Sequence, residues 1–260
     1  MKKFFKLFLS WFNNLQLRIK IICLFLFCVI MPLTITDGMI LSRIVAIEEA
    51  DEKYEAEETV VAIQDLMADV LENCEKISTS ISLNRNVEEF LGEKYDNSYD
   101  YFAKYYMMTD NSYFQTLVGF SETKVKIYSN NPSMKNGGYV GRISSLNDKE
   151  WYKEFASSGL KRTLVTFFDA SDGYYSPNRK IVYLSKLSYP NNKYDQFVYV
   201  ENDYRAIGNA LKNVAYDGEV LLCHDGKVIV SSSGNNNIGQ DFGKLSIKRR
   251  DIMCTKTVYA

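Results

Sequence analysis

The residues that could do chemistry in this 260-residue chain are few and scattered. His224 is the only histidine, so a Ser-His-Asp site would have to include it. No second histidine and no Cys-x-x-Cys pair stands near it to hold a metal ion. The five cysteines, spread from Cys23 to Cys254, form no recognisable disulfide framework. We therefore expect no catalytic residue, no metal site and no cofactor in this chain.

Two other patterns match known sites only superficially. The carboxylates of Asp169, Asp172 and Glu201 could support hydrolysis, but nothing in the sequence fixes their separation, and Asp172-Gly173 is typical of a turn. The glycines and lysine of residues 239–246 lack the spacing of a phosphate-binding loop. We expect a solvated loop there.

Aromatic residues form a third group. Trp151 and Tyr152 lie on a short predicted helix, and four other rings lie on strands that we expect to face it: Tyr128, Phe167, Tyr183 and Tyr199. Such residues either fill a core or line a pocket for a small molecule, and the residues themselves leave both interpretations open.

An apolar segment precedes these elements. A helix from Ile21 to Leu41 would rise roughly 31 Å at 1.5 Å per residue, enough to cross a membrane. Basic residues precede it without any acidic residue: Lys2, Lys3, Lys6, Arg18 and Lys20. Acidic residues dominate after it, so the positive-inside rule places the N-terminus in the cytoplasm and the rest of the chain outside. An uncleaved anchor is favoured over a signal peptide, because no small-x-small cleavage site follows.

A long helix is predicted next, from Arg43 to Ser82, a stretch without glycine or proline. Its apolar residues recur at alternating spacings of three and four: Val60, Ile63, Met67, Val70, Cys74, Ile77 and Ile81. This stripe could pack along the sheet of its own domain or form the seam of a parallel dimer, and we leave both alternatives open.

The rest of the chain predicts an α+β fold with an antiparallel sheet. Helices are expected at about 87–108, 148–158 and 204–214, the short one capped by Asn147 or Asp148 and ended by Gly159. Strands are expected at 124–128, 164–168, 181–188 and 196–200, followed by a hairpin of 219–223 and 228–232.

Four strings occur in a characteristic order: Lys126–Asn131, Trp151–Lys153, Phe197–Glu201 followed by Tyr204, and Leu221–Ser232. With the apolar span and the long helix before them, they resemble the double-Cache sensor domains of Gram-positive sensor histidine kinases. The resemblance extends over nearly the whole chain and is carried by the order of the strings.

The resemblance implies a PAS-like sheet as a distal lobe, followed by the beginning of a membrane-proximal lobe. The expected regions are a cytoplasmic tail (1–18), a transmembrane helix (19–41), a signalling helix (42–83), the distal lobe (84–214) and an incomplete proximal lobe (215–260). It also implies a non-enzymatic input module that is homodimeric and membrane-bound, in the N-terminal part of a longer receptor or in a truncated product. A chemoreceptor, a cyclic-dinucleotide enzyme and a stand-alone anchored binding protein are the alternatives.

The resemblance further implies a small ligand in the distal lobe: an amino acid, an amine or a carboxylate. The implied site residues are Tyr128, Lys149, Trp151, Tyr152, Phe167, Tyr183, Tyr199 and Glu201. Lys149 stands where amino-acid-binding members carry arginine, which weakens the case for an amino acid because lysine offers no bidentate fork. The net charge of −1 and the lack of a basic stripe give no reason to expect a nucleic-acid partner.

Overall fold

The computed structural model describes residues 16–118, 123–169, 178–190 and 192–214, together with 216, 218–224, 226–233, 238–241, 243 and 252–255. The chain divides into two compact units, Met1–Glu57 and Glu58–Ala260. The fold has a long N-terminal helix followed by a mixed helix-and-sheet domain, which confirms the predicted α+β class.

Helix α2 (Leu17–Ser82) contains both the apolar segment and the long helix as one continuous element of 66 residues. Pro32 lies within it. In the first unit its apolar side chains are exposed, among them Leu24, Phe25 and Phe27. Among the described residues, α2 is the one helix long and apolar enough to cross a membrane, with a mean hydropathy of 2.4 in its most apolar window.

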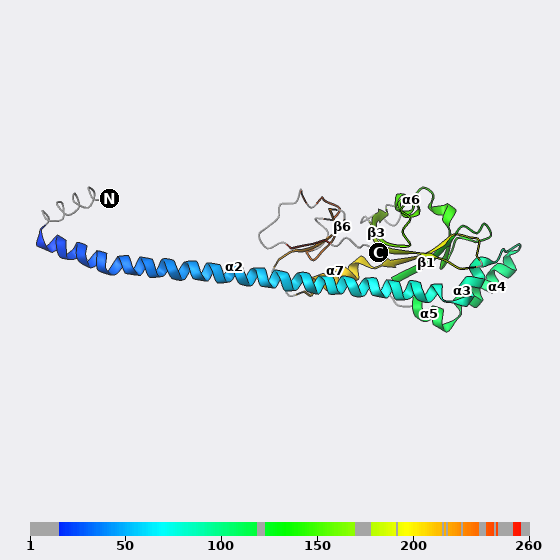
Figure 1. Ribbon diagram of the computed structural model, residues 1–260, viewed down its shortest axis with the longest axis horizontal. Helices are drawn as coiled ribbons and strands as arrows, with labels where there is room; N and C mark the ends of the chain where they lie inside the picture. Colours follow the sequence, from blue (N-terminus) through cyan, green and yellow to red (C-terminus); the bar gives the residue numbers. More distant parts are fainter. Residues whose placement is uncertain are drawn as a thin grey trace. The chain divides into compact units, whose positions relative to one another are not determined.

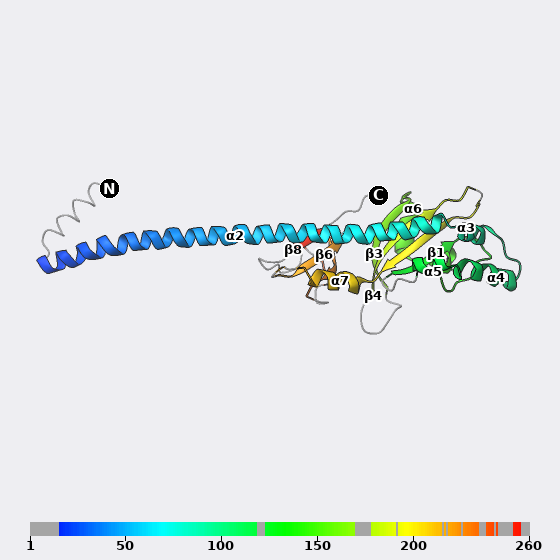
Figure 2. The same cartoon turned by 90° about the horizontal axis from the view of Figure 1, so that it is seen from below.

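In the second unit, the apolar stripe of α2 faces the domain. Ile63, Met67, Cys74, Ile77 and Ile81 are buried there, and the C-terminal part of α2 lies along the sheet (Figures 1 and 2). The helix therefore packs on its own domain along this stretch, the first of the two alternatives for the stripe. The dimer seam stays a prediction.

The single helix expected at 87–108 is wrong. Two helices stand there, α3 (Arg85–Gly92) and α4 (Ser98–Thr109), and a further helix, α5 (Ser112–Val118), follows them. The break arises because Asn97 is extended and its side chain accepts a hydrogen bond from the backbone N–H of Asp100. Asn97 is thus an N-cap rather than a residue of a helix interior.

The main sheet has the strand order β2-β1-β5-β4-β3. Its strands are β1 (Thr123–Ser129), β2 (Val140–Arg142), β3 (Arg162–Asp169), β4 (Asn178–Leu187) and β5 (Gln196–Asn202). The pairs β3–β4 and β4–β5 are antiparallel and form a meander, which confirms the antiparallel arrangement predicted for these three strands. Strand β1 also pairs antiparallel with β5. The parallel pairing of β2 with β1 was not predicted. The predicted turn Asp172-Gly173 lies outside the described residues.

A second sheet has the order β7-β6-β8. The predicted hairpin is present as β6 (Val220–His224) and β7 (Lys227–Ser231), with a register shift between Leu222 and Cys223. Strand β8 (Ile252–Thr255) pairs in parallel with β6. Strand β8 was not predicted, because its pairing joins segments about 30 residues apart in the sequence.

Helices α6 (Glu150–Ser157) and α7 (Tyr204–Lys212) complete the domain. The N-cap of α6 is Lys149, which makes no side-chain capping bond, so the expected caps Asn147 and Asp148 are wrong. Gly159 follows the end of α6 with a φ of 72°, as its predicted role requires.

The two faces of the main sheet carry different elements. On β5, Asn202 points to α2, where its amide nitrogen donates to Cys74 Sγ at 3.2 Å. Phe197 points to the other face, where its ring lies 5.5 Å from that of Phe155 on α6. The sheet therefore lies between the stripe of α2 on one face and α6 on the other.

The packing of α2 on the sheet predicts a large cost for truncating its buried stripe. Ile81 is fully buried, so Ile81→Ala should lower the free energy of unfolding by about 2–5 kcal/mol. Val61→Ala, at an exposed site of the same helix, should change it by less than about 0.5 kcal/mol. Urea denaturation followed by Trp151 fluorescence, in a chain carrying Trp11→Phe, measures both values. Equal costs for the two variants would refute the packing.

Candidate functional site

An aromatic cluster occupies the face of the sheet covered by α6. Trp151 of α6 is buried and stacks on Phe167 of β3, with ring centroids 5.3 Å apart and planes inclined by 11°. Its ring centroid also lies 5.7 Å from that of Tyr199 on β5. One helix residue thus contacts rings from two strands that are not neighbours in the sheet.

The cluster continues across the sheet. Tyr152 stacks on Phe197 at 5.7 Å, and Phe197 stacks on Tyr128 of β1 at 5.1 Å. Gly141 of β2 allows the Tyr128 ring to lie where it does, because a Cβ at that position would come within 2.5 Å of a ring carbon. Four elements (α6, β1, β3 and β5) therefore supply one continuous set of rings.

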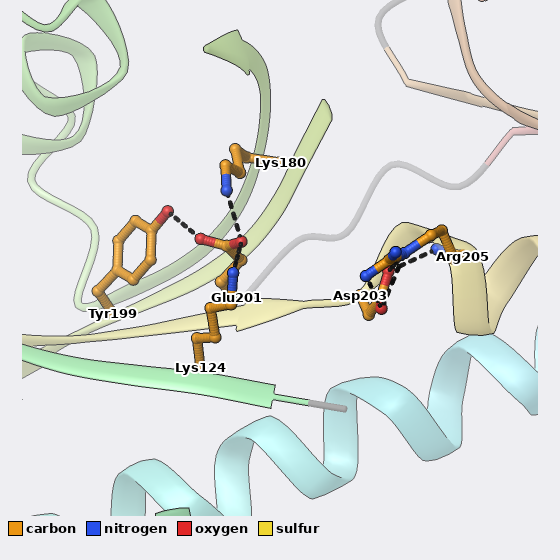
Figure 3. A network of polar contacts seen from close by, with 6 residues as sticks. All are labelled: Lys124, Lys180, Tyr199, Glu201, Asp203 and Arg205. Atoms are coloured by element: carbon orange, nitrogen blue, oxygen red, sulfur yellow. Dashed lines mark hydrogen bonds and ion pairs between the residues drawn. The ribbon is translucent and has the colours of Figure 1, made fainter. Parts of the chain in front are cut away.

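A charged centre lies on the same face. The Glu201 carboxylate accepts hydrogen bonds from Lys180 Nζ at 2.7 Å and from the Tyr199 hydroxyl at 3.0 Å. The Lys180 and Glu201 side chains are only 9% and 15% exposed, whereas that of Lys124, 3.8 Å away, is 80% exposed. Figure 3 shows Lys180, Tyr199 and Lys124 converging on Glu201. Both oxygens of the Glu201 carboxylate therefore accept a hydrogen bond.

Strand register brings these groups together. Glu201 is paired with Lys124 on β1 and with Val182 on β4. Lys180 lies two residues before Val182 and therefore points to the same face, diagonally across from Glu201. The pairing of Lys180 with Phe167 on β3 places the ammonium group beside the aromatic cluster.

Burial and charge perturb the tyrosines of this face. Burial, followed by the nearby charge of Glu201, raises the pKa of Tyr128 to about 12. Burial, followed by the charge of Asp195, also raises the pKa of Tyr152. Both phenols therefore stay neutral well above physiological pH.

Most of the residues implied by the resemblance share this face. They are Tyr128, Trp151, Tyr152, Phe167, Tyr199 and Glu201. Lys149 is exposed at the N-cap of α6. The structure does not bring Tyr183 together with them, because it pairs with Val200 and Leu164 on the opposite face. Burial raises the Tyr183 pKa there, with smaller effects of Arg162, Glu75 and Cys74, which lie on β3 and α2. The expectation that Tyr183 faces α6 is thus corrected.

Two residues of the face were missed by sequence reasoning: Lys180 and Phe197. Lys180 carried a usable signal, since it alternates with Val182 and Leu184 on the inner face of a strand and a lysine there needs a partner. Phe197 was noted only as part of the string Phe197–Glu201. Its role as the ring between Tyr128 and Tyr152 depends on three-dimensional contacts.

His224 lies outside this site. Its Nδ1 is 3.1 Å from Thr166 Oγ1, so it contributes to a contact between β6 and β3. Within the described part of the chain, no three His, Cys, Asp or Glu side chains gather in a metal-binding cluster.

Comparison with known proteins identifies the fold. No protein-family model matches the chain, and no curated protein matches it. Among solved structures, the ligand-binding domain of the Campylobacter jejuni chemoreceptor Tlp3 in complex with L-valine aligns with a TM-score of 0.50. That alignment covers 79% of this chain and 78% of the other at 12% identity. The chain has the same fold as this Tlp3 domain.

Two further alignments have lower TM-scores. The sensor domain of the Vibrio cholerae histidine kinase DctB aligns with a TM-score of 0.44 at 15% identity. That alignment covers 68% of this chain and 65%, less than two thirds, of the DctB domain. The Tlp3 sensory domain with isoleucine bound aligns with a TM-score of 0.46 at 10% identity, covering 72% and 73% of the two chains.

The Lys180–Glu201 pair predicts non-additive mutational costs. Lys180→Met leaves a largely buried carboxylate without its nearest cation, so it should lower the free energy of unfolding by about 1–3 kcal/mol. Adding Glu201→Met should recover part of that loss, because no unpaired charge remains. Lys124→Met, at the exposed lysine, should cost less than about 1 kcal/mol. Urea denaturation of the wild type, Lys180→Met, Glu201→Met and the double variant checks this, with Lys124→Met as the control, and purely additive costs would contradict it.

The raised pKa of Tyr128 predicts a specific loss of stability at high pH. Its folded pKa of about 12 lies above the ordinary value of 10, so its stabilising effect is complete below about pH 10 and is lost as pH rises through 12. Tyr128→Phe cannot ionise and removes no hydrogen bond to a described residue, so it should lose less stability between pH 10 and 12. Urea denaturation followed by circular dichroism checks the difference. Parallel pH profiles for the variant and the wild type would contradict it; Tyr99→Phe, at an exposed ring, is the control.

Proposed function

We propose that this chain is the membrane-anchored input module of a sensor, which binds a small ligand between α6 and the main sheet and passes the signal inward through α2. The observation that carries the proposal is the Lys180–Glu201 pair beneath the aromatic cluster. Burying an ion pair is often no more stabilising than a well-packed apolar pair, so a site role accounts for it better than a core role.

The groups of this face suit a charged ligand with an apolar part. A ligand ammonium group could take the place of Lys180 at Glu201, and a ligand carboxylate could take the place of Glu201 at Lys180. The rings of Trp151, Phe167 and Tyr199 would then contact the apolar part or a cation. Amino acids, amines and carboxylates are therefore the classes to test, and the L-valine complex of the Tlp3 domain supports including small amino acids.

The contacts of β5 offer a route for the signal. Asn202 is adjacent to Glu201 but points to the opposite face, where it bonds to Cys74 of α2. A ligand that separates Glu201 from Lys180 would shift β5 and, through Asn202, the helix. This works only if the ligand binds the shifted state more tightly than the unshifted one.

The proposal extends to topology and output. We infer that the apolar segment of α2 crosses the membrane, with the basic N-terminal residues in the cytoplasm and the domain outside. A histidine kinase is the proposed output, on the resemblance to kinase sensor domains. A chemoreceptor is the alternative, which the likeness to the Tlp3 domain favours. Homodimerisation remains part of the proposal.

A thermal-shift screen of the detergent-solubilised full chain tests the proposed site. The panel contains L-amino acids, amines and short carboxylates. A compound at 100 times its Kd should stabilise the domain by about 2.7 kcal/mol, a shift of several degrees. Glu201→Gln and Trp151→Ala should abolish the shift, and Glu72→Gln, in an exposed ion pair with Lys76, should preserve it. If no compound in the panel gives a shift that is lost in both site variants, the proposal is contradicted.

A further inference from the structure

A cavity of about 290 Å³ lies beside α6, where β4 ends and β5 begins. Tyr152, Lys186, Asp195 and Phe197 are among its lining residues, whereas Trp151, Lys180 and Glu201 are not. Gln196, which also lines it, is five residues from Glu201 along β5, roughly 16 Å at 3.3 Å per residue. The cavity is therefore separate from the charged centre described above.

Two opposite charges line this cavity without pairing. The described contact of the Lys186 ammonium is with the ring of Phe155, whose centroid is 5.1 Å away. The Asp195 carboxylate accepts a hydrogen bond from Asn130 Nδ2 at 2.9 Å. Lys186 and Asp195 form no ion pair with each other, although both are described and both line the cavity. A ligand with both charges could therefore bridge them.

The Asp195 carboxylate is held in place before any ligand arrives. Its own backbone N–H donates to Asn130 Oδ1 at 3.0 Å, while Asn130 Nδ2 donates to its carboxylate. This reciprocal pair of bonds fixes the side chain at the start of β5. A fixed carboxylate loses little conformational entropy on binding a cation.

Apart from Gln196, the rest of the lining is mainly apolar. Phe155, Phe197 and Ile143 are all buried residues of the cluster between α6 and the sheet. Tyr152 completes this wall, and its ring stacks on that of Phe197. An apolar wall with a few fixed polar groups is the usual composition of a small-molecule site.

We infer that this cavity is a second binding site, for a small zwitterion with an apolar body, whose ammonium group binds Asp195 and whose carboxylate binds Lys186. The apolar body lies against Phe155 and Phe197. The inference does not depend on the proposed function, because it uses neither Glu201 nor Lys180. Tyr152 and Phe197 belong both to the lining of this cavity and to the aromatic cluster, so the cluster would connect the site with the charged centre.

Calorimetric titration of the detergent-solubilised full chain with L-phenylalanine and L-leucine tests this site. Two matched half-ligands show whether both charges are needed: 3-phenylpropionate lacks the ammonium group, and phenethylamine lacks the carboxylate. The zwitterions should bind, and each half-ligand should bind roughly tenfold more weakly or worse, because each leaves one charge of the site unpaired. Equal affinity for a half-ligand, or no binding of either zwitterion, would overturn the inference.

Variants separate this site from the charged centre. Lys186→Met, at an exposed residue, and Asp195→Asn should each weaken zwitterion binding roughly tenfold or more. Lys153→Met, at an exposed lysine of α6, is the matched control and should leave it unchanged. Binding that is lost in Glu201→Gln but unchanged in Lys186→Met would overturn the second site while supporting the proposed function. Since Asp195→Asn could alter the Asn130 pairing, Lys186→Met is the decisive variant.

Discussion

The alternation of side chains along β5 is the constraint on which the rest of the domain depends. This strand lies at the centre of the main sheet and pairs with both β1 and β4. Residues 198, 200 and 202 point to α2, and residues 197, 199 and 201 point to α6. A shift of one residue in its register would exchange the two sets and place Glu201 against the apolar stripe of α2. The register of β5 thus determines which side chains lie on each face of the sheet.

The α6 face combines groups that an ordinary core would avoid. Lys180 and Glu201 are largely withdrawn from water but bonded to each other, and Tyr199 satisfies the second carboxylate oxygen. Where β4 ends and β5 begins, Lys186 and Asp195 line a cavity without pairing. The Glu201 carboxylate is bonded by protein groups, whereas Lys186 and Asp195 border an open cavity. Phe197 and Tyr152 line the cavity and stack on each other, and Tyr152 also contacts Trp151 of the aromatic cluster.

The periodicity of apolar residues in the sequence was sufficient to predict the elements that bury one face. The stripe of α2 and the meander β3-β4-β5 follow from spacings of three and four and from period two. Contacts between distant segments had no such signal: the pairing of β2 with β1, the third strand β8, and the position of Tyr183, whose face depends on its register with Val200. The helix break at Asn97 was readable in principle, because asparagine is a favoured N-cap residue. Most rings of the site were predicted by resemblance. Phe197 was missed because its role depends on its contacts with Tyr128 and Tyr152, whereas Lys180 carried a sequence signal that was overlooked.

Trp151 is the most direct reporter of whether the α6 face responds to a small ligand, as we propose. The chain has two tryptophans, so Trp11→Phe leaves Trp151 as the single one. Incorporation of 5-fluorotryptophan then gives one ¹⁹F NMR resonance from the stack of Trp151 on Phe167. We predict that a compound that stabilises the domain also shifts this resonance in a saturable way, with the same Kd. A stabilising compound that leaves the resonance unmoved would contradict the account.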